Sequence, residues 1–345
     1  MTVEDARVRE VLQGEEAWIV GGAVRDVLLG KPVLDLDVAC REPSEAARRF
    51  ARRFGGSPFP LSERHGAWRV ASNGPETVDF TPLADGIDDD LATRDFTFNA
   101  IAVPVAGGDP RDPSGGVGDL EAGIVRAVSD LVFEADPLRL LRAARFEDEL
   151  GFRMDERTEE LVRASAALVT RPAGERVLGE LRRLSADGFR RLDELGLLEP
   201  LGGTLDGRLD AVDDPDFRLV AAFGHRLSRL PISRNMHRYA SALLRVTRPS
   251  EPSPRAIHRF RQQTEPWTLD ALAFVGAPEL ASVVEEARRT EPREPLVRGD
   301  ELDLAPGPEI GRILAAIDEE RAAGTISTRD EAFVLARRLA EEGPP

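Results

Sequence analysis

The sequence contains little of what several classes of protein require. Its 345 residues include a single cysteine, Cys40, which excludes an intrachain disulfide and a cysteine-cluster zinc site. No apolar run approaches the roughly 20 residues that a helix needs to cross a bilayer. Residues 1–16 are acidic and lack the basic and then apolar pattern of a secretory signal. We therefore expect a cytoplasmic protein with no membrane partner.

Lysine is almost missing as well, because Lys31 is the only lysine among the 46 basic residues. The net charge of −16 argues against nonspecific binding of nucleic acid by the whole surface, although it allows a local basic track. Arginine suits bidentate contacts to phosphates and base edges, so the positions of the arginines matter more than their number.

Histidine is scarce, and none of the four histidines is followed by aspartate, which excludes an HD-type phosphohydrolase domain. The sequence also has no P-loop lysine, no serine nucleophile elbow and no zinc-ligand spacing. These absences remove several common hydrolase and ATPase mechanisms.

The expected secondary structure changes along the chain. Up to about residue 130, short apolar runs alternate with helical patterns and turn residues. The expected strands are 17–20, 33–38, 68–71 and 77–80, the expected helices are 23–29 and 44–54, and a turn is expected at 72–75. Beyond this part helical patterns dominate, with proline-rich breaks at 248–254 and 291–295. We predict an α/β head followed by an all-α neck, body and tail, with the boundaries 1–130, 131–195, 196–290 and 291–345.

Two acidic residues interrupt the expected strand 33–38. Asp35 and Asp37 are two positions apart, so their side chains leave the same face of the strand. Neighbouring carboxylates repel each other, and Mg²⁺ is a hard cation that compensates them and suits nucleotide phosphates. Asp79 can supply a third carboxylate, and three carboxylates around two metal ions are typical of in-line nucleotidyl transfer. The alternative is the solvated face of an edge strand.

A glycine pair precedes this strand. Gly21 and Gly22 lie between a strand and a helix, where glycine lets the backbone approach a phosphate and the helix start favours an anion. Arg25, one turn later, directs a guanidinium to the same anion, and Asp26 is expected to orient Arg25 or the turn rather than to bind metal. A glycine pair is by itself a weak signal, since turns use it freely.

The combination is more specific than its parts. The segments Gly21–Asp26, Leu28–Gly30 and Asp35–Asp37 together resemble the signature of the class II CCA-adding enzymes and bacterial poly(A) polymerases. These enzymes belong to the polymerase β nucleotidyltransferase superfamily. The resemblance implies a polymerase β-like mixed sheet, Mg²⁺ held by Asp35 and Asp37, the nucleotides CTP and ATP, and the 3′ end of tRNA or another RNA as acceptor.

Residues 94–100 resemble the second motif of the same family. Arg94 is then a ligand of phosphate or ribose, Asp95 fixes Arg94 or the sugar, and Asn99 holds neighbouring backbone. The alternative for Asp95 and Asn99 is a hydrogen-bond network at a helix start.

Residues 136–146 resemble the family's nucleotide-selection helix, with Asp136 as N-cap and Pro137 as first helical residue. The family implies that Asp136 and Arg139 act as an amino-acid template. A carboxylate accepts a hydrogen bond from the amino group of cytosine or adenine, while a guanidinium donates to the ring acceptors. Many relatives carry glutamate where this chain has Ala135.

Arg139, Arg142 and Arg145 recur every three residues and form one arginine stripe on the expected helix. Arg142 and Arg145 would contact base or phosphates; the alternative is a solvated arginine face paired with Asp148 and Glu149. Residues 175–181 resemble the helix that braces the selection helix, for which we expect a buried Glu–Arg pair. Residues 295–311 resemble the tail, which in the family grips the tRNA elbow.

The resemblance implies template-independent addition of C and/or A to tRNA 3′ ends with release of pyrophosphate. The stretch between Asp79 and Arg94 is shorter than in many relatives, so A-adding, CC-adding and poly(A)-adding enzymes remain alternatives. A non-catalytic RNA-binding protein and an enzyme that modifies a small molecule agree less well with the acidic pair and the arginine stripe. The sequence indicates no protein partner.

Overall fold

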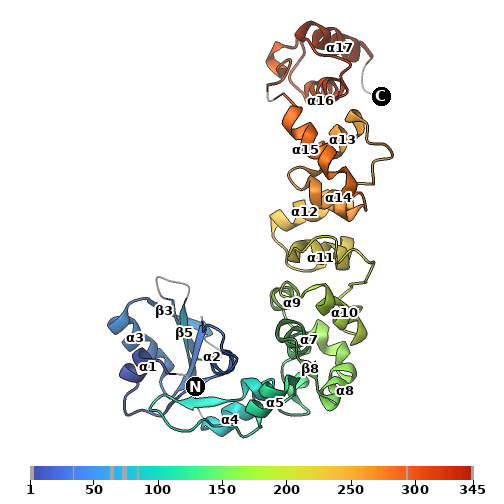
Figure 1. Cartoon of the computed structure of the whole chain (residues 1–345). Helices are drawn as coiled ribbons and strands as arrows, with labels where there is room; N and C mark the ends of the chain where they lie inside the picture. The colour runs from blue at the N-terminus through green and yellow to red at the C-terminus, as the bar shows by residue number, and fades with distance from the viewer. Residues whose placement is uncertain are drawn as a thin grey trace. The chain divides into compact units, whose positions relative to one another are not determined.

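The computed structural model describes residues 4–33, 35–62, 66–71, 76–83, 85–292 and 294–342 (Figure 1). The chain forms two compact units, Met1–Gly202 and Gly203–Pro345. The finer division into head, neck, body and tail stays a prediction, and the turn expected at 72–75 lies outside the described residues. No helix among the described residues has the length and apolar character needed to cross a bilayer.

The first unit begins with a six-stranded mixed sheet in the order β3-β4-β5-β2-β1-β6. All neighbouring strands are antiparallel except β2 and β5. The strands are β1 (Ala17–Val20), β2 (Asp35–Cys40), β3 (Ser57–Ser62), β4 (Ala67–Ala71), β5 (Thr77–Pro82) and β6 (Ala102–Pro104). The helical segments around them are α1 (Ala6–Val11), α2 (Gly22–Leu28), α3 (Pro43–Phe54), α4 (Ile87–Ala92) and η1 (Thr97–Asn99).

Each face of the sheet has its own hydrophobic core. Ile19, Val38 and Phe80 pack in one cluster with residues of α1, α2 and α3, among them Phe50. Val20 and Ala39 pack in a second cluster with residues of α4. Successive residues of a strand therefore serve opposite faces, as strand geometry requires.

The four expected strands and both expected helices of the head are present, with shifts of up to two residues. The second helix, α3, starts at Pro43, one residue earlier than expected, and proline suits a first helical position. The helix ends before Gly55, whose φ of 85° favours glycine. Gly30, with a φ of 70°, follows α2 in the same way.

Helices make up most of the rest of the first unit, which agrees with the expected helical remainder. They are α5 (Gly116–Ala122), α6 (Val132–Ala135), α7 (Arg139–Leu150), α8 (Glu156–Ala164), η2 (Ala166–Thr170), α9 (Gly174–Leu181) and α10 (Ala186–Glu194). One short parallel pair, β7 (Ile124–Val125) with β8 (Arg153–Met154), interrupts them, so this part is not purely α-helical.

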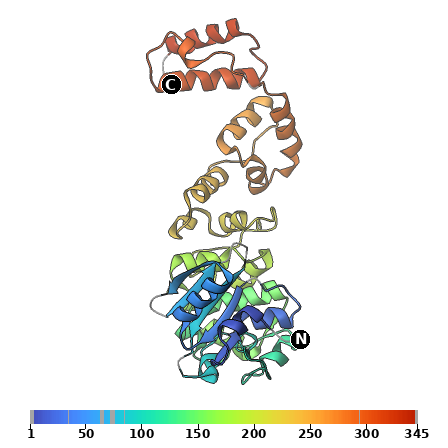
Figure 2. The same ribbon diagram turned by 90° about the vertical axis from the view of Figure 1, so that its left-hand side faces the viewer.

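The second unit is helical in its described residues. Its segments are α11 (Pro215–Phe223), η3 (Gly224–Arg229), α12 (Arg234–Leu244), α13 (Pro254–Thr264), α14 (Thr268–Phe274), η4 (Pro278–Leu280), α15 (Ala281–Thr290), η5 (Gly299–Glu301), α16 (Pro308–Ala322) and α17 (Arg329–Glu342). The last two helices lie side by side (Figure 2) and share a core that includes Ile313, Ile317 and Leu335.

Candidate active site

The two carboxylates of β2 lie on the sheet face opposite to Leu36 and Val38. Asp35 is exposed and accepts a hydrogen bond of 2.6 Å from the Thr77 hydroxyl. Asp37 is partly buried, and burial raises its pKa to about 6; the Arg94 guanidinium opposes this rise, while Asp79 and Asp35 add to it. The acidic side of the site therefore holds negative charge that the protein compensates only in part.

Asp79 lies beside Asp37, because the two residues are partners in the parallel β2–β5 register. Its carboxylate is buried and accepts two hydrogen bonds from Arg69, one of 2.7 Å from Nε and one of 2.6 Å from Nη2. Across the described ranges, no group of three histidine, cysteine, aspartate or glutamate side chains is arranged to hold a metal ion. Two aspartates agree with Mg²⁺, which often takes one or two protein carboxylates and completes its shell with phosphates and water.

The glycine turn fits tightly against this acidic pair. Gly21 has a φ of 68° and caps α2. A Cβ atom at this position would lie 3.1 Å from Nη1 of Arg94 and 3.4 Å from Oδ2 of Asp37. Both the backbone conformation and the space therefore favour glycine at position 21.

Arg25 points from α2 toward the segment that contains Asn99. Its Nη1 donates to Oδ1 of Asn99 over 2.9 Å, and its Nε donates to Oδ1 of Asp26 over 2.8 Å. The expectation that Asp26 orients Arg25 is confirmed. The guanidinium is thus held by two partners in the structure.

The second motif forms a buried network. Oδ1 of Asp95 accepts from Nδ2 of Asn99 over 3.0 Å and from the Phe96 backbone N–H over 2.8 Å, and Oδ2 lies 2.6 Å from Nη2 of Arg142. Burial alone would raise the pKa of Asp95, but Arg142 and these hydrogen bonds hold it below its ordinary value. Asp95 and Asn99 therefore form the network expected as their alternative role. Arg94 instead pairs with Asp90, at 2.8 Å.

The selection helix starts later than expected. α7 begins at Arg139, with Leu138 rather than Asp136 in the N-cap position. Backbone N–H groups of Arg139 and Leu140 bond to carbonyls three residues earlier, so residues 136–138 form tighter turns before the helix. Asp136 still accepts a hydrogen bond of 3.2 Å from the Leu138 N–H.

The expected template pair contacts other groups of the protein. Oδ2 of Asp136 lies 2.8 Å from Nη2 of Arg176, a residue of α9. Nη2 of Arg139 donates to the Thr93 carbonyl over 2.7 Å. A nucleobase that binds Asp136 would therefore compete with Arg176 or share the carboxylate with it.

Arg145 is not part of a solvated face, because its side chain is only 3% exposed. It lies 2.5 Å from Glu180 of α9 and 2.6 Å from Glu149 of its own helix. The Glu–Arg pair expected for the bracing helix is therefore present. Glu180 supplies its carboxylate and Arg145 its guanidinium. Asp148 instead accepts from the Ser185 backbone N–H, at 2.7 Å.

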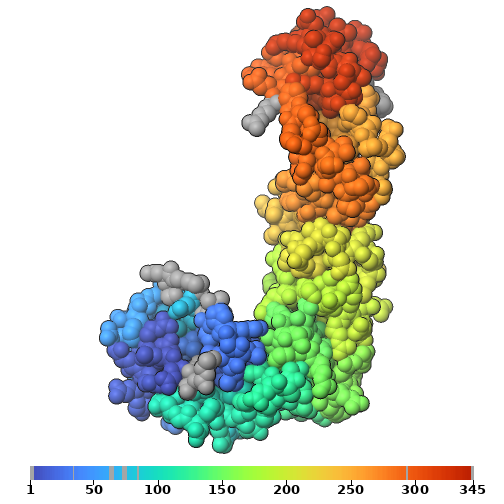
Figure 3. All heavy atoms as spheres, in the orientation of Figure 1, coloured from blue at the N-terminus to red at the C-terminus, as the bar shows by residue number. Residues whose placement is uncertain are grey.

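One pocket of about 580 Å³ contains every expected site residue except Asp79. Its lining comes mostly from segments of the head, which Figure 3 draws in blue to cyan, and from α7, which it draws in green. The pocket is also lined by Asp26, Pro32, Phe146 and Arg183. Phe146 is the last, apolar residue of the segment 136–146 that resembles the selection helix, and Arg183 has no distinguishing sequence signal.

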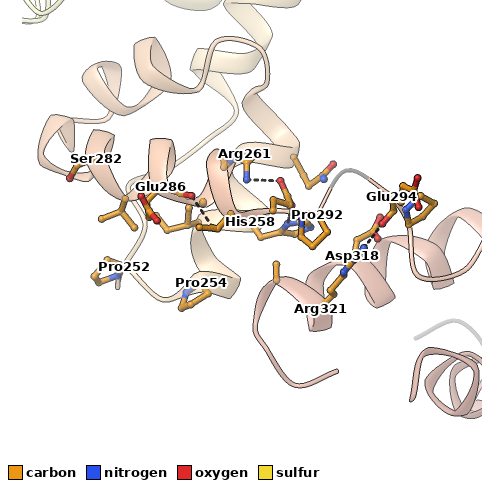
Figure 4. A pocket seen from close by; sticks show the side chains of 18 residues that line it. Pro252, Pro254, His258, Arg261, Ser282, Glu286, Pro292, Glu294, Asp318 and Arg321 are labelled. Atoms are coloured by element: carbon orange, nitrogen blue, oxygen red, sulfur yellow. Dashed lines mark hydrogen bonds and ion pairs between the residues drawn. The ribbon is translucent and has the colours of Figure 1, made fainter. Parts of the chain in front are cut away.

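A second pocket, of about 740 Å³, lies within the second unit among α13, α15 and α16 (Figure 4). Its buried His258 contacts Glu291 at 3.1 Å, and Arg261 contacts the same carboxylate at 2.8 Å. None of the expected catalytic or nucleotide-binding residues lines it.

Family models match two stretches of the chain. Residues 17–84 and 71–126 match the poly(A) polymerase head domain. Residues 151–202 match a domain described as the probable RNA and SrmB-binding site of polymerase A. The expected site residues up to Asn99 lie in the first match, and Asp136 to Arg145 lie between the two.

Curated relatives and solved structures extend the likeness to almost the whole chain. The A-adding tRNA nucleotidyltransferase of Deinococcus radiodurans is 33% identical, over 95% of this chain and 96% of the relative. The CC-adding tRNA nucleotidyltransferase of Thermus thermophilus is 30% identical, over 92% of both chains. The Thermotoga maritima CCA-adding enzyme in complex with tRNA has the same fold, with a TM-score of 0.76 and 21% identity over 97% of this chain and 96% of that chain. This chain therefore belongs to the family of tRNA nucleotidyltransferases and bacterial poly(A) polymerases, and it is a nucleotidyltransferase.

Proposed function

We propose that this protein adds C and/or A nucleotides from CTP and ATP to the 3′ end of tRNA, without a nucleic acid template, and releases pyrophosphate. The observation that carries the proposal is that the acidic pair Asp35–Asp37 and the selection pair Asp136–Arg139 line one pocket. The distances and partners given above support distinct tasks for the two pairs.

Asp35 and Asp37 are the proposed ligands of Mg²⁺. They share one face of β2, and the raised pKa of Asp37 reflects burial beside other carboxylates, which a divalent cation would relieve. When bound, Mg²⁺ would lower the pKa of the attacking 3′ hydroxyl and stabilise the leaving pyrophosphate. Asp79 is the proposed third acidic residue of the catalytic group, and its pairing with Arg69 favours a role in fixing the charge next to Asp37.

The triphosphate is proposed to lie along the glycine turn. Gly21 and Gly22 keep side chains out of the approach, while Arg25 and Arg94 bring two guanidinium groups to the same side of the pocket. Guanidinium groups bind phosphate oxygens through paired hydrogen bonds. Asn99 and Asp26 hold Arg25 in place for this task.

The base is proposed to be read by Asp136 and Arg139. Cytosine and adenine present an amino donor beside ring acceptors, which a carboxylate and a guanidinium complement; uracil and guanine present a different pattern. Arg142, on the next turn of α7, adds a partly exposed guanidinium to the pocket, whereas Arg145 is buried between Glu180 and Glu149. The acceptor RNA is proposed to contact residues 151–202, which match the RNA-binding domain, and the predicted tail 291–345.

The direct test supplies labelled CTP and ATP, separately and together, to tRNA transcripts that end before CCA, after one C and after CC. Addition of CCA to the first transcript by the two nucleotides together would identify a complete CCA-adding enzyme. Addition of only CC, or of A only to the transcript that ends in CC, would identify a partial enzyme. The two relatives described above differ in this respect, so identity alone does not decide it.

An RNA acceptor other than tRNA tests the remaining alternative, a poly(A) polymerase. Repeated addition of A to an unstructured RNA would identify a poly(A) polymerase. Failure to transfer any nucleotide to any of these acceptors in Mg²⁺ would contradict the proposal and favour a non-catalytic RNA-binding protein.

A further inference from the structure

The pocket wall contains an aromatic side chain to which the mechanism above gives no task. Phe146 of α7 lines the pocket, although its side chain is almost fully buried. The guanidinium carbons of Arg145, Arg25 and Arg142 lie 4.3, 5.3 and 5.5 Å from the centre of its ring. All three distances are within the roughly 6 Å over which an aromatic ring attracts a cation.

The three arginines come from two sides of the pocket. Arg25 belongs to α2 and lies next to the glycine turn, whereas Arg142 and Arg145 belong to α7. Each also has a polar partner: Asn99 for Arg25, Asp95 for Arg142 and Glu180 for Arg145. Cations gathered around one point repel each other, and the negative face of an aromatic ring lowers that repulsion.

Phe146 is itself held in place by two other rings. Its centroid lies 5.6 Å from that of Phe96 and 5.1 Å from that of Phe98, with interplanar angles of 84° and 85°. These are edge-to-face arrangements, which aromatic pairs favour. Phe96 and Phe98 belong to the segment that also carries Asp95 and Asn99, so one ring connects α2, this segment and α7.

We propose that Phe146 is a positioning residue for nucleotide selection. Its ring fixes Arg25, on the triphosphate side, relative to Arg142 and Arg145 on the helix that reads the base. A triphosphate bound at Arg25 then places the attached base at a set distance from α7. This inference rests on the proposed function, because it takes Arg25 to be a triphosphate ligand and α7 to be the helix that reads the base.

Fluorinated phenylalanines at position 146 in the full-length protein provide the test. Fluorine withdraws charge from the ring face and leaves shape and burial nearly unchanged, so it weakens the attraction for cations. With pentafluorophenylalanine we expect KM for CTP or ATP to rise about tenfold, equivalent to about 1.4 kcal/mol. A monofluorinated ring should give a smaller rise, and preference for CTP or ATP over UTP should fall. kcat should change less than KM.

Phe189 of α10 provides the matched control. It is fully buried in the same unit, and within the described part of the chain no guanidinium lies over its ring. Pentafluorophenylalanine at position 189 should leave KM and the preference over UTP unchanged. The variant Phe146→Leu should lower Tm and also raise KM, whereas Phe189→Leu should lower Tm alone.

Two outcomes would overturn the inference. One is an unchanged KM and an unchanged nucleotide preference in the fluorinated Phe146 proteins. The other is a Phe146→Leu protein with a lower Tm and an unchanged KM. If Phe146→Leu does not fold, the fluorinated series decides. A wild-type protein that transfers no nucleotide from CTP or ATP would contradict the proposed function instead, so the two failures are distinguishable.

Discussion

The two sides of the pocket are stabilised in opposite ways. On the acidic side, Asp37 has a raised pKa and, among the described residues, no hydrogen bond or ion pair holds its carboxylate. On the α7 side, Arg142 has Asp95, Arg145 has Glu180 and Glu149, and both lie near the Phe146 ring.

The two sides therefore differ in how far the protein itself neutralises their charges. The α7 side is largely neutralised within the protein, so its geometry is set before a nucleotide arrives. The acidic side keeps a charge imbalance that a divalent cation would remove. Substitutions of the acidic residues should therefore have their largest effect on activity. Substitutions of the residues that pair with the arginines of α7 should have their largest effect on stability.

Replacing Asp37 tests the acidic side and should have the largest effect. We expect Asp37→Asn to lower kcat for nucleotide transfer from CTP and ATP roughly a thousandfold, because several kcal/mol of metal-dependent charge stabilisation is lost. The metal-free protein should become more stable, by up to about 3 kcal/mol at pH 7, because a buried and repelled charge is removed. Single-turnover kinetics and urea unfolding measure the two effects.

The exposed Asp89 of α4 is the matched control for this substitution. Asp89→Asn should change neither kcat nor stability appreciably. Normal transfer by Asp37→Asn would show that Asp37 is not a metal ligand, and the comparison between the two sides would fail.

Replacing Glu180 tests the α7 side and should mainly affect stability. Glu180→Gln leaves the buried guanidinium of Arg145 with Glu149 as its remaining acidic partner. Removing one member of a buried ion pair costs about 3–5 kcal/mol, and Glu149 should reduce the loss to about 2 kcal/mol. The exposed pair Arg157–Glu160 supplies the control, because Glu160→Gln should cost less than about 0.5 kcal/mol. Equal losses in the two variants would contradict the role assigned to burial.

The pH dependence of Mg²⁺ binding tests the raised pKa of Asp37. Because this pKa is about 6 in the folded protein, against an ordinary value of 3.8, the ionised form is disfavoured. Its contribution to the stability of the metal-free protein is therefore fully present below about pH 3.8 and is lost as pH rises through 6. Mg²⁺ requires the ionised carboxylate, so Kd should rise up to about tenfold for each pH unit below 6.

Calorimetric titration of MgCl₂ between pH 5 and pH 8 measures this dependence. Asp37→Asn should bind Mg²⁺ weakly and without the same change near pH 6. A wild-type Kd that stays constant from pH 5 to pH 7 would rule out proton competition at Asp37.

The smallest effect is expected at the partner of Asp136. Arg176→Gln removes the guanidinium that pairs with this carboxylate, and the pair is substantially exposed. Exposed pairs contribute about 0–1 kcal/mol, so stability should hardly change. Preference for CTP or ATP over UTP should shift by a factor of two to five, which corresponds to about 0.4–1 kcal/mol. Steady-state or competition assays measure this preference. An unchanged preference would show that Arg176 does not influence how Asp136 reads the base.

Short sequence patterns predicted those features of the head that neighbouring residues determine. β1 covers the residues expected for it, and Asp26 holds Arg25 one position away. β3 was missed because Pro58 and Pro60 interrupt it, and proline is tolerated there at an edge of the sheet.

The pairings that define the site depend on tertiary structure and could not be predicted from spacing. Asp79 pairs with Arg69 because β4 and β5 are adjacent in one register, where the two residues are partners. Arg145 is buried against Glu180 because α9 packs on α7. Sequence spacing could not show the contact between Phe146 and Arg25, since it requires α2 and α7 to meet.

Gly21 has one more consequence for the pocket. The position that its absent Cβ would take lies 3.1 Å from a guanidinium nitrogen and 3.4 Å from a carboxylate oxygen. This is a small volume bounded by both signs of charge, and a methyl group would exclude any ligand atom from it. An alanine there would leave every charged residue of the site in the sequence and still occupy the space between Arg94 and Asp37, the proposed phosphate and metal ligands. The shape of this corner of the pocket thus depends on the missing side chain as much as on the charged groups around it.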